Sequence, residues 1–362
     1  MPPPAAADAA STSPKSRGSA ALRGRWSVVC AFAIVACDKE KPATFDAAPA
    51  ASASPSATAS ASDANDASTA ATATASDAGA SRCPADMAYV DTMFCPDVER
   101  TCIDVEHEEP NHLTICHAFE KNKQRCKTKE EHRQFCVDRY EYPNLEGAHP
   151  VWMLTWFQAQ ATCKAKEKRL CWSSEWTAAC EGPEHTPFPY GWVRDHDKCN
   201  MDNFFIDPRK GGGNFLFYSK DPEVAKLELA RLDQSVPSGS MKDCKSGSGV
   251  YDMPGNMDEW VVSDQPPEHK SKWAALKGGA WGHVRSQCRP MTVSHEPEFW
   301  YYFVSFRCCK DAEGAPAWQP PPGRGNMMPP EVEAHDFAPD PVVPVNPSGP
   351  SKTKYGLPRK HE

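Results

Sequence analysis

The spacing of the cysteines constrains this 362-residue chain more than any other feature, because fourteen of its sixteen cysteines lie between Cys83 and Cys309. The residues ahead of them have the pattern of an export signal. An even number of cysteines behind such a signal indicates up to seven disulfides formed in an oxidising compartment. A zinc ribbon is excluded, because its ligands come in C-x-x-C pairs and the chain has none. Residues 83–312 are long enough for one domain with a sizeable core.

The first 36 residues predict a signal peptide. Four basic residues precede the apolar run Trp26–Ala36, which is too short to span a bilayer but suits the apolar region of a signal peptide. The run ends in Ile34-Val-Ala-Cys37, which resembles a bacterial lipobox. This resemblance implies that Cys37 becomes a lipidated N-terminus on a bacterial cell-envelope protein, periplasmic or on the outer surface. The alternative is an ordinary secretory signal cut elsewhere.

Two segments flank the predicted domain. Residues 37–82 are nearly all Ala, Ser, Thr, Asp and Pro, which leaves too little large apolar surface to offset the entropy of ordering. They predict a disordered tether, and the Pro-rich residues 313–362 predict a disordered or extended tail. The whole chain has a formal charge of −8, and residues 1–36 contribute four positive charges and one negative charge, so the remainder is near −11. An acidic chain without basic clusters argues against nucleic-acid binding.

The stretch Gly249–Trp260 combines a turn signal with oxygen donors. Val250-Tyr251 predicts a short buried strand, and Pro254-Gly-Asn256 predicts a tight turn, because Pro fixes φ while Gly and Asn tolerate positive φ. Asp252, the turn carbonyls and Glu259 can converge on one point. Carboxylate and carbonyl oxygens are what Ca²⁺ takes, so a calcium site is one interpretation and an ion-free corner is the other.

Local patterns predict few regular elements. Thr155 caps a helix that runs to about Lys166, with Trp156 and Cys163 on its apolar face. A second helix begins near Ser173–Trp176, where serines stand at the cap and an acid follows in the first turn. Strands are predicted at Met87–Val90 and Phe135–Pro143, with loops over the rest of 83–126.

Several motifs together resemble the formylglycine-generating enzyme (sulfatase-modifying factor) family. Its hallmark reads G-x-Y-D/N-M-x-G-N-x-x-E-W, then R-G-G-S-W/F, then G-F-R; the corresponding segments here are Gly249–Trp260, Lys277–Trp281 and Ser305–Arg307. The segment Thr155–Gly182 resembles the family's two-helix signature, with Cys171 where the family usually has Pro. The resemblance covers about 83–312. It implies an α+β, C-type-lectin-like fold that is disulfide-rich and has little regular secondary structure.

The resemblance also implies a chemistry that this chain retains only in part. The family enzyme oxidises a sulfatase cysteine to formylglycine with O₂ and with Cu(I) held by two thiolates, and soft Cu(I) prefers sulfur ligands. Counted from Gly278-Gly279, the two copper positions are His283 and Cys288, and the motif's serine is Ala280. A Cys–His pair can bind copper, but Cys288 is also one of fourteen cysteines available for disulfides.

Two further sets of residues are carried over from the family. The calcium ligands are the carboxylates of Asp252 and Glu259 and the carbonyls of Gly255 and Met257, with a second site at Asn200 and the Met201 carbonyl. For disulfides, the family pairs Cys163 with Cys308, while its partner for Cys180 falls on Val293. Cys180 is therefore expected to pair with Cys171 or Cys309. Cys199 and Cys244 flank the 200–243 insertion and are expected to close it.

Two functions remain open, and the sequence lacks the motif for a third. The favoured one is a non-catalytic binding or scaffold module of the cell envelope, with a protein or glycan ligand and a lipid anchor in the membrane. The alternative is a formylglycine-generating oxidase that uses copper and O₂. A third, sulfur insertion by a non-haem iron enzyme of the same superfamily, needs an H-x-x-x-H-x-E motif. His107, His112, His117 and His132 do not have that spacing.

Overall fold

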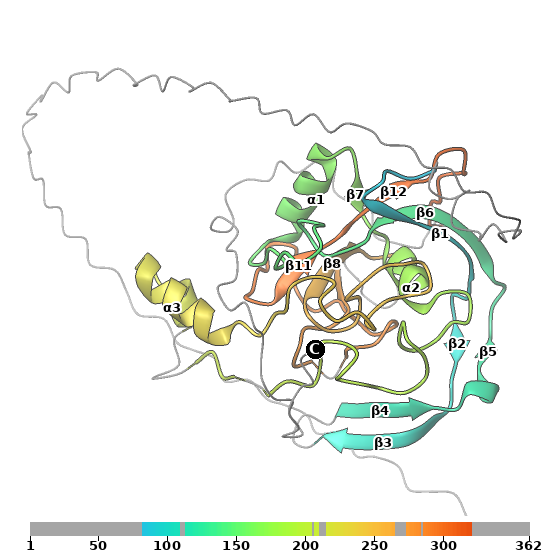
Figure 1. Cartoon of the computed structure of the whole chain (residues 1–362), viewed down its shortest axis with the longest axis horizontal. Coiled ribbons are helices and arrows are strands. Elements are labelled where there is room, and N and C mark those ends of the chain that lie inside the picture. The colour runs from blue at the N-terminus through green and yellow to red at the C-terminus, as the bar shows by residue number, and fades with distance from the viewer. Residues whose placement is uncertain are drawn as a thin grey trace, which may run out of the picture. The chain divides into compact units, whose positions relative to one another are not determined.

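The computed structural model describes residues 82–320 apart from 109–112, 205, 210–214, 265–272 and 284. It shows an α+β fold with two four-stranded sheets, two two-stranded sheets and three α-helices in these residues (Figure 1). The predicted signal peptide, the lipidation residue Cys37 and most of the tether and tail lie outside the described residues. No helix in the described part is both long and apolar enough to cross a membrane.

The strands of the first sheet run in the order β1-β6-β12-β7, and those of the second in the order β10-β9-β8-β11, in which β11 is parallel to β8. The first comprises β1 (Met87–Phe94), β6 (Glu131–Asp138), β12 (Cys308–Asp311) and β7 (Arg169–Leu170). The second comprises β10 (Met291–Thr292), β9 (Ala274–Lys277), β8 (Asp258–Val262) and β11 (Val304–Phe306). The small sheets pair β2 (Val98–Glu99) with β5 (Arg125–Cys126) and β3 (Cys102–Glu108) with β4 (Leu113–Phe119).

The helices are α1 (Trp156–Ala165), α2 (Ser173–Glu181) and α3 (Pro222–Leu232), with short 3₁₀ turns η1 (Lys121–Lys123) and η2 (Leu216–Tyr218). The prediction for α1 is confirmed, and the Thr155 hydroxyl accepts the Gln158 N–H as a capping box requires. In α2 the cap position is Trp172 rather than a serine, because the Glu175 carboxylate accepts the Trp172 N–H at 3.0 Å.

Three strand predictions need correction. Val250-Tyr251 is not a strand, since Tyr251 makes only an isolated bridge with Lys245. The strand predicted over Phe135–Pro143 begins earlier and ends at Asp138. Residues 83–126 are not mostly loops but carry β1 to β5, because cross-strand pairing and disulfides order a segment whose own periodicity is weak.

All fourteen cysteines of the described residues form disulfides. The pairs are Cys83–Cys136, Cys95–Cys126, Cys102–Cys116, Cys163–Cys308, Cys171–Cys309, Cys180–Cys288 and Cys199–Cys244. The Cys163–Cys308 bridge is the pair that the resemblance implies, and Cys199–Cys244 closes the insertion.

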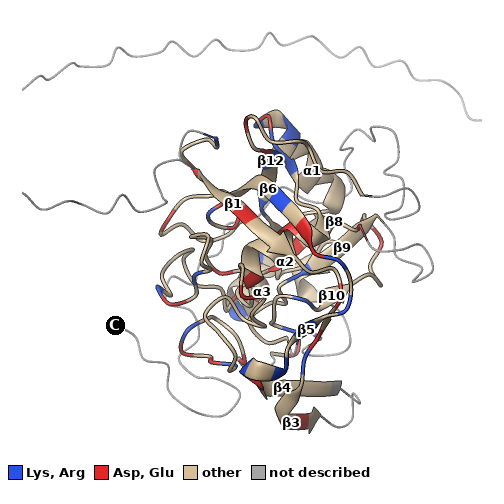
Figure 2. Ribbon diagram, turned by 90° about the vertical axis from the view of Figure 1, so that its right-hand side faces the viewer, with Lys and Arg blue, Asp and Glu red and all other residues tan. Residues whose placement is uncertain are grey.

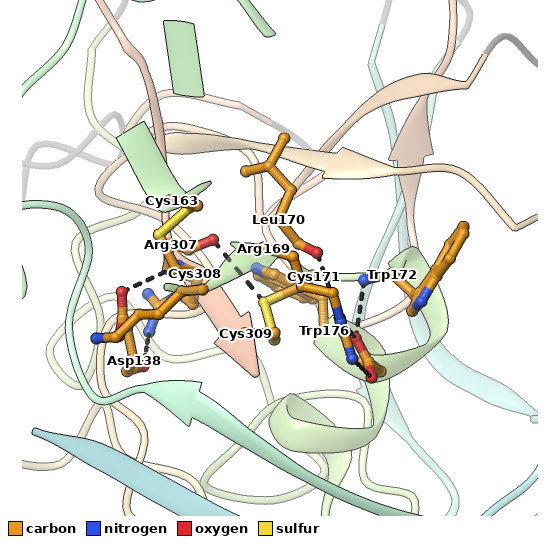
Figure 3. Close-up of a disulfide and its surroundings, with 12 residues drawn as sticks. Asp138, Cys163, Arg169, Leu170, Cys171, Trp172, Trp176, Arg307, Cys308 and Cys309 are labelled. Atoms are coloured by element: carbon orange, nitrogen blue, oxygen red, sulfur yellow. Dashed lines mark hydrogen bonds and ion pairs between the residues drawn. A yellow bond between two sulfur atoms is a disulfide. The ribbon is translucent and has the colours of Figure 1, made fainter. Parts of the chain in front are cut away.

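The expected partner of Cys180 was wrong. Cys308 and Cys309 are adjacent in β12, so their side chains leave opposite faces of the strand. Figure 3 shows the result: Cys308 reaches Cys163 of α1, while Cys309 reaches Cys171 ahead of α2. Because Cys171 and Cys309 bind each other, Cys180 of α2 pairs with Cys288 instead.

Two buried tryptophans tie α1 and the residues just before it to the second sheet. The indole N–H of Trp156 donates to the Val261 carbonyl at 3.0 Å, and that of Trp260 donates to the Leu154 carbonyl at 2.8 Å. Each satisfied N–H allows a large apolar ring to be buried without an unpaired donor. Acidic and basic segments are interspersed over the ribbon seen in Figure 2.

Candidate functional site

The centre of the hallmark stretch is a buried ion pair between Glu259 of β8 and Arg307. The Arg307 guanidinium donates to both Glu259 oxygens, at 2.6 and 2.7 Å, and both side chains are fully buried. The indole N–H of Trp176 donates to the same carboxylate at 2.8 Å. Arg307 also donates to the Tyr251 carbonyl at 3.0 Å, so it joins the residue after β11 to the segment that leads into the turn. This pair is hydrogen-bonded on all sides, as a buried ion pair must be to persist.

Two more carboxyl groups are buried near this pair. Burial raises the pKa of Asp252 to about 7, although the Gly239 N–H donates to its carboxylate at 2.6 Å. Burial also raises the pKa of Glu141 well above its usual range, and the negative charges of Asp252 and Glu259 add to the effect. The charge of the Arg307 guanidinium acts on all three carboxyl groups, and the raised pKa values of Asp252 and Glu141 reduce the excess negative charge that they would otherwise place here.

The residues present do not fit the expected calcium site as a set. Both Glu259 oxygens already accept hydrogen bonds from Arg307 and Trp176, so the guanidinium occupies the position beside this carboxylate that a metal ion would take. Asp252 lies at positive φ in the turn, as does Asn256. In the described residues, no group of three or more His, Cys, Asp or Glu side chains is arranged to hold a metal ion.

The expected second site at Asn200 and Met201 is a network of amide hydrogen bonds. The Asn200 amide donates to the Asn256 side-chain oxygen and to the Gln234 carbonyl, both at 2.9 Å, and accepts from Asn203 at 3.0 Å. The Asn200 carbonyl accepts the Asn256 N–H at 2.8 Å. The Asn200 side-chain oxygen that would bind a cation therefore accepts from Asn203 of the same loop, while the Asn200 side-chain N–H groups join this loop to Gln234 and Asn256.

The two copper positions do not form a thiolate pair. Cys288 is bonded to Cys180, so it has no thiol while this bridge is intact. The His283 ring packs edge-to-face on Phe303 at 4.6 Å between centroids, and its Nδ1 lies 3.2 Å from a carboxylate oxygen of Asp258. These residues do not provide the donor set that Cu(I) requires in the family enzyme, so they support no copper-dependent step.

A row of aromatic side chains extends from His283 to the surface. Phe303 contacts Tyr301, which is stacked on Phe299, and Tyr218 of η2 packs on Trp300 at 4.4 Å. Phe215 and Tyr218 are 38% and 40% exposed, and the others are half-buried. We call the partly exposed rings of this row the aromatic face; they are Phe215, Tyr218, Phe299, Trp300 and Tyr301.

Sequence reasoning missed this face and two buried charged residues. Tyr218 and Trp300 are 82 residues apart, and their side chains meet only in the folded chain. Arg194 forms a buried pair with Asp202 at 2.7 Å and donates to the carbonyls of His283 and Ser286, which fixes the loop after the Gly-Gly motif. Lys277 is completely buried; the only signal in the sequence was its place in that motif, where the family has Arg.

Comparison with known protein families identifies the family of this domain. The chain matches the model of the sulfatase-modifying factor enzyme 1-like domain over residues 100–312, which is more than half of its length. The chain therefore belongs to the sulfatase-modifying factor family. The resemblance predicted from the motifs is confirmed, as is the α+β, disulfide-rich fold.

Solved structures show weaker similarity. A crystal structure of CarF shares 14% identity, covers 62% of this chain and 98% of its own, and has a TM-score of 0.37. PvdO from Pseudomonas aeruginosa shares 15% identity, covering 62% of this chain and 92% of its own with a TM-score of 0.29. Treponema denticola variable protein 1 shares 14% identity, covering 61% and 99% with a TM-score of 0.32. The family assignment rests on the domain match and not on these structures.

Proposed function

We propose that this chain is an exported, lipid-anchored binding module of the bacterial cell envelope that does not generate formylglycine. The Cys180–Cys288 bridge carries this proposal, because it removes one of the two thiols that hold copper in the family enzyme. The other position is His283, whose ring packs on Phe303 beside Asp258. Glu259 and Arg307 of the family hallmark are kept and form the buried ion pair, so the fold is retained without the copper ligands.

The ligand surface in this proposal is the aromatic face, and its ligand is a protein. Rings held by edge-to-face contacts lose little freedom on binding, and Trp, Tyr and Arg dominate the energetics of protein interfaces. Arg209 lies beside this face and is exposed, and its charge acts on the Tyr301 hydroxyl. Exposed apolar rings with an arginine at their border have the composition of a protein-binding hot spot.

The first experiment tests for catalysis. The purified protein is incubated with Cu(I), O₂ and a C-x-P-x-R peptide, and the peptide is analysed by mass spectrometry. We expect no conversion of the peptide cysteine to an aldehyde, and non-reducing peptide mapping of the same sample should show Cys180 linked to Cys288. Aldehyde formation would overturn the proposal in favour of the oxidase.

The second experiment tests the binding surface in intact cells. A photo-crosslinking amino acid replaces Phe215 on the aromatic face or, as the matched control, Ile103 on β3, which is 60% exposed. We expect a discrete protein adduct from position 215 and none from position 103. An adduct that glycosidases remove would identify a glycan ligand and contradict a protein one. Equal yields at both positions would exclude the aromatic face.

A further inference from the structure

A small cavity beside the first turn of α2 has no role in the proposed binding surface. Its volume is about 60 Å³. The polar wall is formed by Ser173, Ser174 and Thr177 of α2, by Lys277 at the end of β9 and by Arg289. Three hydroxyl groups and two cationic side chains in so small a space suit a polar guest better than an apolar one.

Lys277 is the most unusual residue of this wall, because its side chain is completely buried. Its ammonium donates to the carbonyls of Cys288 and Arg289, both at 2.8 Å, and lies 5.1 Å from the centroid of the Trp176 ring. An ammonium carries three N–H groups, so two carbonyls leave one N–H for a further acceptor. A lysine this deeply buried needs a compensating partner to remain charged.

The charges around the cavity are not balanced. The buried carboxylate of Glu181 binds both Arg100, at 2.6 Å, and Arg289, at 2.6 and 2.8 Å. With Lys277, three cationic groups surround this one carboxylate. The second acid nearby, Asp264, accepts the Ser173 hydroxyl, and its burial raises its pKa and so favours the uncharged form. When Lys277 is protonated, three cationic groups (Arg100, Arg289 and Lys277) accompany the two acids Glu181 and Asp264, and a guest anion would offset the difference.

We propose that this cavity binds a small inorganic oxyanion such as sulfate or phosphate. The Lys277 ammonium supplies the charge and its remaining N–H, and Ser174 supplies a hydroxyl on the cavity wall. The other two hydroxyls are donors to groups of the protein, Ser173 to Asp264 and Thr177 to the Ser173 carbonyl. At roughly 15 Å³ per water molecule, the volume holds about four waters, which is close to the size of a sulfate ion. The first turn of α2 adds a favourable field, because backbone N–H groups at a helix N-terminus attract anions.

The binding test uses sulfate, which does not titrate near neutral pH. The dissociation constant is measured by calorimetry on the full mature protein, with chloride at equal ionic strength as the reference. We expect Lys277→Met to weaken sulfate binding at least tenfold. Lys242→Met is the matched control, since Lys242 is exposed and pairs with Glu146 on the surface. Equal losses in the two variants, or unchanged binding in Lys277→Met, would overturn the proposal.

A second measurement needs no variant and so remains decisive if Lys277→Met does not fold. Burial lowers the pKa of Lys277 to about 7, while the charges of Glu181, Asp264 and Asp258 oppose this shift and that of Arg289 adds to it. Only the ammonium form attracts the anion, and its fraction falls about tenfold between pH 6 and pH 8. The dissociation constant for sulfate should therefore rise about tenfold over this range. A constant that does not change with pH would place the anion elsewhere.

Discussion

At the scale of single residues, the buried Arg307–Glu259 pair should matter far more than a surface pair of the same length. Removing one partner of a buried, hydrogen-bonded pair leaves an uncompensated charge, so we expect Arg307→Met to lower the free energy of unfolding by about 3–5 kcal/mol. Arg125 and Glu99 form an exposed pair, also at 2.6 Å, and Arg125→Met should cost no more than about 1 kcal/mol. Urea unfolding of both variants measures these free energies. Equal decreases in Arg307→Met and Arg125→Met would contradict the conclusion that the Arg307–Glu259 pair is buried.

Asp252 should make stability depend on pH. Its pKa is raised by burial from 3.8 to about 7, so the folded state holds a proton that the unfolded state has already lost. The free energy of unfolding should therefore fall as pH rises from about 4 to about 7. Asp252→Asn should flatten this decline, because Asn tolerates the positive φ at this position and its oxygen can still accept the Gly239 N–H. Unfolding curves of the unsubstituted protein and of Asp252→Asn at pH 5, 6 and 7 test this pH dependence, with Glu99→Gln as the surface control.

Residues whose role depends on local sequence were predictable, and those whose role depends on tertiary packing were not. Thr155 capped its helix as predicted, because capping needs only the residues that follow. Glu259 was assigned to calcium, although Arg307, 48 residues later, binds it. Apart from its place in the Gly-Gly motif, nothing in the sequence indicated that Lys277 is buried, because the groups that accept its N–H bonds are the carbonyls of Cys288 and Arg289, 11 and 12 residues later.

At the scale of elements, the disulfides should differ in what they contribute. Cys171–Cys309 joins the start of α2 to β12 across 138 residues, whereas Cys102–Cys116 joins β3 to β4 across 14. Closing a longer loop restricts the unfolded chain more, by about 1.5–2 kcal/mol for these lengths. We expect C171A/C309A to lower the free energy of unfolding by this much more than C102A/C116A. A larger loss in the β3–β4 variant would contradict the chain-entropy account.

The pairing of Cys180 shows why connectivity was only partly predictable. The family pattern predicted the Cys163–Cys308 pair, but the partner of Cys309 depends on the face of β12 from which its side chain extends. That choice in turn left Cys288 as the partner of Cys180. The face of β12 from which Cys309 extends therefore determines two disulfides, Cys171–Cys309 and Cys180–Cys288, and the second of these removes the thiol of the expected copper ligand Cys288.

At the scale of the whole molecule, removing Ca²⁺ with a chelator should leave the melting temperature of the protein unchanged. An ion that binds only the folded state stabilises it by an amount that depends on its concentration relative to the dissociation constant. The Glu259 oxygens are used by Arg307 and Trp176, so we expect the same melting temperature with and without EDTA. A fall in melting temperature on EDTA treatment, restored by added Ca²⁺, would show that the ion binds despite this arrangement.

The last prediction concerns the anchor at Cys37, which lies outside the described residues. The lipobox-like sequence before it predicts lipidation. Cys37→Ser should move the protein from the membrane fraction to the soluble extracytoplasmic fraction, while non-reducing mapping still shows the disulfides of the domain. A protein that is soluble before the substitution, with an unmodified N-terminus at another residue, would instead establish an ordinary signal peptide.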